Sequence, residues 1–210
     1  MLLYSRTSML VGAPSEVMPA AVAVTERVKD ITGRDIGLWV GGPGFPVGTL
    51  NWAMRIESHS DIGDIGDALN ADSKFNDLVG AMMQYRGGDT VDAVRSLIHG
   101  TPADDLPPVG SMVSATTAQI ANGNIAAAMQ WGSEVAEMVT GITGSNVNFY
   151  RDLYGAFGSV SWLSGQPDGA GIDAAQAALA AAPEYLAKID EGAPLFIPGT
   201  ANQGIATRIA

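Results

Sequence analysis

Three polar side chains share one face of a predicted strand, residues 146–154. Side chains at alternate positions of a strand point to the same side, so Tyr150, Asp152 and Tyr154 lie together. Two phenols beside a carboxylate can donate, accept or move a proton, and we expect Asp152 and Tyr154 to be catalytic and Tyr150 to bind substrate. If the neighbouring Arg151 faces inward it must be paired and can orient a carboxylate or phenolate substrate; if it faces outward it is a solvated residue.

Four large aromatic side chains occupy matched positions in the two halves of the chain. When the halves are aligned, Trp52 corresponds to Trp162, and Trp39 corresponds to Tyr150. Such pairs can line a flat pocket for an aromatic ligand, by stacking and edge-to-face contact. They can equally pack in a core. We carry all four as candidate substrate-binding residues and leave core packing as the alternative.

Two further residues are candidates for acid–base work. Asn51 directly precedes Trp52, and His59 follows Glu57 by two, so that His59 and Glu57 leave the same face of a strand end. That spacing permits a general base oriented by an acid, or a carboxylate–histidine metal pair. A solvated strand end is the simpler interpretation of His59, since no second histidine lies nearby in the sequence.

Other patterns lack what their chemistry requires. The adjacent His59, Ser60 and Asp61 are not a catalytic triad, because neighbouring side chains splay apart whereas a triad converges in space. The glycine-rich segment 41–48 leads into a strand rather than into a helix N-terminus, and it has no lysine to hold phosphate. Cysteine is absent, which excludes disulfides and thiolate chemistry. We expect no metal and no cofactor.

Charge and composition narrow the partners. The chain has 11 Lys and Arg against 22 Asp and Glu, a net charge of −11, and 47% of its 210 residues are hydrophobic. A folded, acidic protein without a basic patch is a poor partner for nucleic acid or an anionic membrane. No apolar run approaches the roughly 18 residues of a membrane span, and no secretory signal is recognisable. We expect a cytoplasmic protein.

The two halves of the sequence resemble each other. Ile31-Thr32-Gly33 recurs as Ile142-Thr143-Gly144, and Gly48-Thr49-Leu50-Asn51-Trp52 recurs as Gly158-Ser159-Val160-Ser161-Trp162. Several matched segments in one order indicate a structural duplication. The predicted domains are a first repeat over 1–100, a Pro-rich linker over 101–109 and a second repeat over 110–210.

Hydrophobic periodicity gives each half the same order of elements, β-α-β-β-α-β. In the first half we predict strands at 2–11, 36–40, 49–58 and 91–98 and helices at 14–33 and 61–85. In the second half we predict strands at 110–120, 146–154, 158–164 and 203–209 and helices at 124–141 and 171–190.

This order predicts an α+β fold made of two tandem ferredoxin-like repeats. Each repeat forms a four-stranded antiparallel sheet with both helices on one face. The open face is not uniformly polar, because Leu50, Trp52 and Met54 alternate with Asn51 and Ala53 along one strand. We therefore expect the two sheets to pack face to face as a pseudo-dimeric α/β barrel with its helices outside.

The element order, its repetition and the Gly-x-x-x-Trp strands at 48–52 and 158–162 resemble the dimeric α/β-barrel superfamily, which includes antibiotic-biosynthesis monooxygenases and NIPSNAP-like proteins. The resemblance implies a small apolar or aromatic ligand. It also invites comparison of Asn51 and Trp52 with the cofactor-independent oxygenases and haem-degrading members, which place an Asn, a Trp and a His around a buried aromatic substrate. In the second half Ser161 stands where Asn51 stands in the first, and no helix carries a histidine for haem.

We expect a small-molecule pocket protein, a cofactor-independent oxygenase or isomerase acting on an apolar or aromatic compound. An enzyme of this kind requires a cavity of several hundred Å³, which we expect between the two sheets. The alternative is a non-enzymatic interaction or structural protein with a filled barrel core. Its homo-oligomer would form through helix faces such as the alanine-rich helix 171–190.

Overall fold

The computed structural model describes residues 1–103 and 105–210; Asp104, which belongs to the predicted linker 101–109, lies outside the described residues. The strands are β1 (Leu2–Leu10), β2 (Ile36–Gly41), β3 (Thr49–Ile56), β4 (Arg86–His99), β5 (Met112–Gln119), β6 (Val147–Asp152), β7 (Ser159–Gln166) and β8 (Asn202–Arg208). The helices are α1 (Pro14–Thr32), α2 (Ser60–Asn70), α3 (Ser73–Met82), α4 (Ile125–Thr143), α5 (Gly169–Ala180) and α6 (Pro183–Gly192). Two short 3₁₀ turns, Met83–Tyr85 and Ala193–Leu195, precede β4 and β8.

The strands form one closed antiparallel barrel in the order β1-β3-β2-β8-β5-β7-β6-β4. The first four strands and the last four follow one another in corresponding order, and hydrogen-bonded pairs join them at both seams. At one seam Trp39 of β2 lies opposite Arg208 of β8, and at the other Leu97 of β4 lies opposite Tyr150 of β6. The two predicted sheets are thus continuous with each other, and the fold is a mixed α+β barrel of eight strands with six helices in the described residues.

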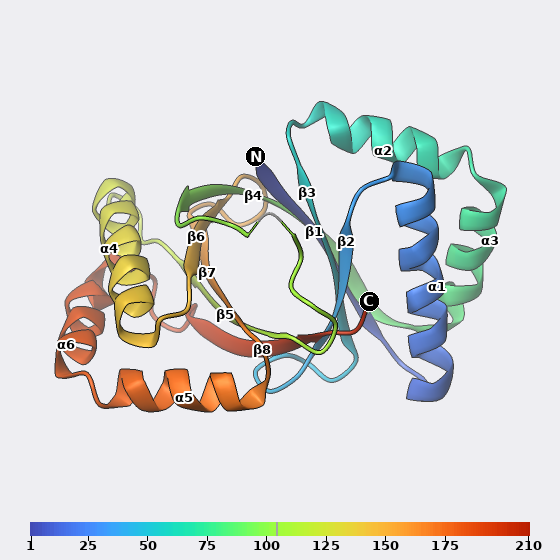
Figure 1. Ribbon diagram of the computed structural model, residues 1–210. Coiled ribbons are helices and arrows are strands. Elements are labelled where there is room, and N and C mark those ends of the chain that lie inside the picture. The colour runs from blue at the N-terminus through green and yellow to red at the C-terminus, as the bar shows by residue number, and fades with distance from the viewer. Residues whose placement is uncertain (104) are drawn as a thin grey trace.

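The helices lie outside the barrel in two groups, α1–α3 beside one half and α4–α6 beside the other (Figure 1). Helix α1 buries a face of Val17, Ala21, Val24 and Val28, whose three- and four-residue spacing follows the helical period. It ends where Gly33 adopts φ +64°, a left-handed conformation that glycine reaches without a Cβ clash. No helix in the described residues is long and apolar enough to cross a membrane.

Two predictions of a single long helix are wrong, because the structure has two shorter helices in each of these segments. The segment 61–85 is α2 followed by α3, because the Asp72 side chain accepts a hydrogen bond from the Phe75 backbone N–H and starts a new helix. The segment 171–190 is α5 followed by α6, since Pro183 lacks the N–H that a continuous helix would need. Strand β4 is also longer than predicted, because it pairs with β1 back to Arg86.

The two faces of the barrel sheet have different neighbours. The outer face carries Leu50, Trp52, Met54 and Ile56, which are buried in a core with α1. The inner face carries Thr7, Asn51 and Trp39, which the register aligns on neighbouring strands β1, β3 and β2. The second half has its own outer core around Phe149, Val160 and Trp162 against α4. Each half therefore packs its main apolar core between sheet and helices.

Candidate functional site

The larger of the two cavities described lies outside the barrel, which corrects the expectation of a cavity between the two sheets. It has a volume of about 560 Å³ and lies between the outer face of β1, β3 and β4 and the helices α1–α3. Its position follows from the sheet alternation, because the large apolar side chains point toward the helices rather than into the barrel. Its apolar wall consists of Leu10, Val24, Val28, Ile36, Trp52, Met54, Ile56, Ile62, Ile65, Leu69, Phe75, Val79, Met82 and Met83.

Helices α2 and α3 cover this cavity without filling it. Neither helix has a fully buried residue, although both are amphipathic. Their inward side chains, including Ile65, Leu69 and Phe75, are only partly buried against the outer core. Gly66 also faces the cavity, and a Cβ built there would meet nothing within 4 Å. The cover is thus loosely packed, and space remains beneath it.

Trp52 forms a fixed part of the wall. Its indole is 8% exposed, and its Nε1–H donates a 2.9 Å hydrogen bond to Thr25 Oγ1 on α1. The Thr25 hydroxyl in turn donates to the backbone oxygen of Ala21 at 2.8 Å. Because this chain anchors the ring edge to the helix, the orientation of the indole is set before any ligand arrives.

The cavity has one polar edge, formed by β1 and β4. Arg6 Nε and Nη2 each donate a 2.8 Å hydrogen bond to one carboxylate oxygen of Asp92. This bond from Arg6 holds the pKa of Asp92 below its ordinary value. Tyr4 lines the same edge, and burial raises the pKa of its phenol, which Arg6 opposes. At neutral pH the edge therefore presents a charged pair and a neutral hydroxyl.

Spacing along the sequence does not reveal this edge. Tyr4 and Arg6 do show the two-residue spacing of one strand face, but Asp92 lies 86 residues from Arg6. Only the pairing of β1 with β4 brings them together, in the register that puts Arg6 opposite Asp92. The alternation within residues 2–10 was the one indication available.

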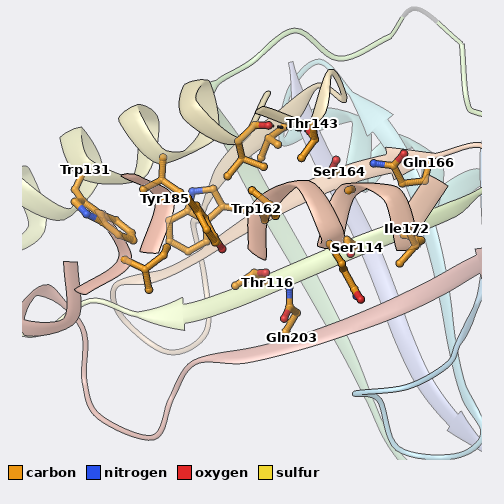
Figure 2. A pocket seen from close by; sticks show the side chains of 17 residues that line it. Ser114, Thr116, Trp131, Thr143, Trp162, Ser164, Gln166, Ile172, Tyr185 and Gln203 are labelled. Atoms are coloured by element: carbon orange, nitrogen blue, oxygen red, sulfur yellow. Dashed lines mark hydrogen bonds between the residues drawn. The ribbon is translucent and has the colours of Figure 1, made fainter. Parts of the chain in front are cut away.

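A second cavity occupies the corresponding place in the other half. Thr116 lies between Trp162 and Gln203 on neighbouring strands, just as Arg6 lies between Trp52 and Asp92. Figure 2 shows Thr116 and Gln203 on the sheet below Trp162 and Tyr185. This cavity has a volume of only about 150 Å³, and none of the described residues that line it carries a charge at neutral pH.

Aromatic packing accounts for the smaller volume. Phe149 stacks on Trp162 with ring centroids 4.7 Å apart, and Trp131 and Phe196 contact the same indole edge-on at 6.0 Å. At the matched positions the first half has Ala20 for Trp131, Leu38 for Phe149 and Arg86 for Phe196, which places no second aromatic ring beside Trp52. The second half therefore fills the space that the first half leaves open.

Most of the other predicted site residues lie inside the barrel, away from both cavities. Trp39 and Tyr150 are buried there, and Asn51 Nδ2 donates to Thr7 Oγ1 at 2.8 Å. Asp152 accepts a 3.0 Å hydrogen bond from Arg95 Nε, and Arg95 Nη1 donates to Ser5 Oγ at 2.8 Å. These polar groups mostly bond to one another within the barrel.

Burial affects the ionisable groups of this interior. Desolvation raises the pKa of Asp152, while Arg95 opposes the rise. Desolvation also raises the pKa of Tyr150, and the positive charges of Arg55 and Arg95 oppose it. Tyr150 is therefore a neutral phenol at neutral pH.

The remaining predicted residues lie elsewhere. His59 and Tyr154 are both exposed and contact each other edge to face, with ring centroids 5.7 Å apart. Tyr154 follows the end of β6, so it does not share a strand face with Tyr150 and Asp152 as predicted. Arg151 is half-buried on the face of β6 that carries Phe149. Trp52 and Trp162 each line a cavity, one in each half.

Comparisons with known proteins show that this chain has a fold similar to that of several solved structures. No protein-family model and no curated protein sequence matches the chain. Among solved structures, a proposed monooxygenase from Fusobacterium nucleatum matches with a TM-score of 0.75 and 9% identity, over 100% of this chain and 92% of that one. An anthrone oxidase-like protein matches with a TM-score of 0.69 and 11% identity, over 100% and 91%.

A proposed monooxygenase from Lactobacillus acidophilus matches with a TM-score of 0.63 and 10% identity, over 99% of this chain and 93% of that one. Identities this low carry no residue roles from one chain to another. What the likenesses support is the architecture, over essentially the whole length of each chain. The chain shares the eight-stranded α+β barrel fold of these monooxygenase-like proteins.

Proposed function

We propose that the protein binds a small apolar or aromatic compound in the larger cavity, between the barrel and helices α1–α3. The observation that carries the proposal is the cavity of about 560 Å³ with an apolar wall, Trp52 and one polar edge. Pockets for small organic ligands have this volume and this mixture of many apolar groups with few polar ones. The smaller cavity, about 150 Å³, is too small for a comparable ligand.

The finer proposal is that the compound is oxidised, with molecular oxygen as oxidant, or isomerised, without a bound cofactor. The names of the matching structures, two proposed monooxygenases and an anthrone oxidase-like protein, favour oxidation over isomerisation. Of the candidate site residues, Trp52 lines the larger cavity, whereas Asn51, His59, Asp152 and Tyr154 are not among its lining residues in the described chain. Catalytic roles for these four remain predictions.

The alternative of a structural protein with a filled barrel has partial support. Trp39, Tyr150, Ser5 and Ser161 are all buried, so the barrel interior is well occupied. A filled interior does not decide between the two functions, however, because the larger cavity lies on the other side of the sheet. A homo-oligomer formed through the alanine-rich face of α5 remains a prediction.

We also propose that the chain arose by duplication of a ferredoxin-like unit, with repeats at 1–100 and 110–210 joined by the linker 101–109. The matched segments, which follow one another in the same order in both halves, support this. The corresponding order of β1–β4 and β5–β8 around the barrel supports it as well. The likeness to NIPSNAP-like proteins remains a prediction from the sequence.

Filling part of the cavity is expected to weaken ligand binding without unfolding the protein. Gly66→Leu puts a branched side chain into open space beneath α2, and replacing a helical glycine removes a helix penalty of about 1 kcal/mol. We expect the affinity for naphthalene-2-carboxylate methyl ester, measured by equilibrium dialysis, to fall at least about tenfold.

Gly63→Leu is the matched control. Gly63 belongs to the same helix, is exposed, and does not line the cavity. This variant should bind the ester as the unmodified protein does, with a similar gain in helix stability. Equal binding by both variants, or no binding by the unmodified protein, would overturn the proposed function.

A further inference from the structure

We infer that the compound bound in the larger cavity is an amphipathic monoanion, an apolar body with one carboxylate that binds Arg86 at the start of β4. This inference rests on the proposed function and deepens it by naming the class of ligand. It comes from the charges on the cavity wall, which differ in sign from those of the protein as a whole.

The charged residues that line the larger cavity have a net positive charge. Among the described residues that line the cavity, the charged ones are Arg6, Arg86 and Asp92, a local sum of +1. The whole chain carries −11. Since charges more than about 10 Å away are largely screened in physiological salt, the charged group nearest the ligand, and not the net charge of the chain, decides which ligand charge is favoured.

The two arginines are bound differently. Arg6 directs Nε and Nη2 to Asp92, which compensates its charge. In the described part of the chain, Arg86 makes one side-chain hydrogen bond, from Nε to the backbone oxygen of Gly88 at 3.1 Å. A backbone oxygen carries no net charge, so Arg86 keeps its positive charge and both terminal amino groups for an external acceptor. A planar guanidinium suits a carboxylate well.

The count of charges favours one negative charge on the ligand. A monoanion balances the one charge that the lining leaves uncompensated, that of Arg86, whereas a dianion such as a phosphate monoester would leave one negative charge unbalanced. A cation would have to compete with Arg6 for Asp92. The apolar wall on the opposite side, with Trp52, Met54 and Phe75, requires that the rest of the ligand be hydrocarbon or aromatic.

The smaller cavity supports the assignment by contrast. Thr116 and Gln203 occupy the places that Arg6 and Asp92 occupy in the larger one, and no lining residue in the described part of the chain is charged at neutral pH. Of the two cavities, only the larger one is therefore lined by the Arg6–Asp92 ion pair and by the further charge of Arg86. The architecture of sheet and helices does not require them, because the second half forms the same arrangement without them.

The first experiment compares three probes that share a ring system at pH 7. These are naphthalene-2-carboxylate, its neutral methyl ester and the cationic 2-(aminomethyl)naphthalene, with affinities measured by equilibrium dialysis. We expect the carboxylate to bind about three- to tenfold more tightly than the ester, the range of a charge-assisted hydrogen bond at a half-exposed site. The cation should bind most weakly.

The second experiment changes the charges in both directions. Arg86→Gln should reduce the affinity for the carboxylate to that for the ester and leave the ester unaffected. Lys74→Gln is the matched control: it removes one positive charge from α3 at an exposed position that does not line the cavity, and it should change neither affinity. Asp92→Asn frees Arg6 and should raise the affinity for the carboxylate.

The outcomes separate the two proposals. If the ester binds and Gly66→Leu blocks it, but the carboxylate has no advantage or Arg86→Gln leaves that advantage intact, the assignment of a monoanion is wrong and the proposed binding function stands. If Arg86→Gln and Lys74→Gln weaken carboxylate binding equally, the effect is one of overall charge and the assignment is again wrong. If no probe binds, both proposals fail.

Discussion

Asp152→Ala is expected to lower the free energy of unfolding by about 2–4 kcal/mol, because it removes the charged partner of a mostly buried arginine side chain, Arg95. Asp152 accepts a 3.0 Å hydrogen bond from Arg95 Nε inside the barrel, and the two side chains are 19% and 20% exposed. Without the carboxylate, the Arg95 guanidinium would keep its charge in a poorly solvated place. Its remaining bond in the interior is the one that Nη1 donates to Ser5 Oγ.

Chemical denaturation of three variants would measure this. Asp152→Asn retains a carbonyl oxygen that can accept from Arg95, so it should cost less than Asp152→Ala. The double variant Arg95→Met with Asp152→Leu removes both charges and should recover most of the stability, as apolar replacements of buried ion pairs often do. A double variant no more stable than Asp152→Ala would show that the charge on Arg95 is not the cause.

The pH dependence gives an independent readout. Burial raises the pKa of Asp152 above its value in the unfolded chain, so the folded state holds the proton more tightly. The contribution of this group to stability is therefore largest at low pH and declines as the pH rises from the unfolded pKa through the folded one. Asp152→Asn should remove that decline. Full stability of Asp152→Ala with loss of turnover would instead assign Asp152 to chemistry.

The strands and helices of the barrel could be predicted from the sequence more accurately than which face of each strand points into the barrel. Alternation along β3 correctly separates Leu50, Trp52 and Met54 from Asn51 and Ala53. It could not tell which set faces the barrel, because an apolar face can pack either inside a barrel or against helices outside it. Helix α1 decides the matter by burying Trp52, whose Nε1–H bonds to Thr25. The cavity was therefore expected on the wrong side of the sheet.

The candidate residues on β6 do not form one site, because local spacing does not show where a strand ends. Tyr150, Asp152 and Tyr154 share a two-residue spacing, but β6 ends at Asp152 and Tyr154 turns outward to contact His59. The charged edge of the larger cavity joins Arg6 to Asp92, a pairing that no local spacing encodes. Matched tryptophans, in contrast, were informative: each half uses one against its helices, and each lines a cavity.

The backbone conformation explains why a glycine precedes the strand in each Gly-x-x-x-Trp segment. Gly48 and Gly158 have φ of +89° and +82°, in the left-handed region that favours glycine. Each carbonyl accepts a hydrogen bond of 2.9 Å: Gly48 from the N–H of Leu10, the last residue of β1, and Gly158 from the N–H of Ile120, directly after β5. The turn thus sets the start of the strand that carries Trp52 or Trp162.

Gly48→Ala is expected to cost about 3–5 kcal/mol of unfolding free energy, more than any other single change considered for this chain. The left-handed conformation costs a residue with a Cβ about 1–2 kcal/mol, and the new Cβ would lie 2.1 Å from the backbone oxygen of Leu10, so β1 or the turn must move.

Gly155→Ala is the control. Gly155 has φ +92°, but a Cβ added there would meet nothing within 4 Å, so this variant should lose only the conformational part of the stability. Thermal and chemical denaturation of both variants would separate strain from collision. Equal losses would show that the contact with Leu10 relaxes freely, and that the β1–β3 seam, on which the wall of the larger cavity is built, is less rigid than its hydrogen bonds indicate.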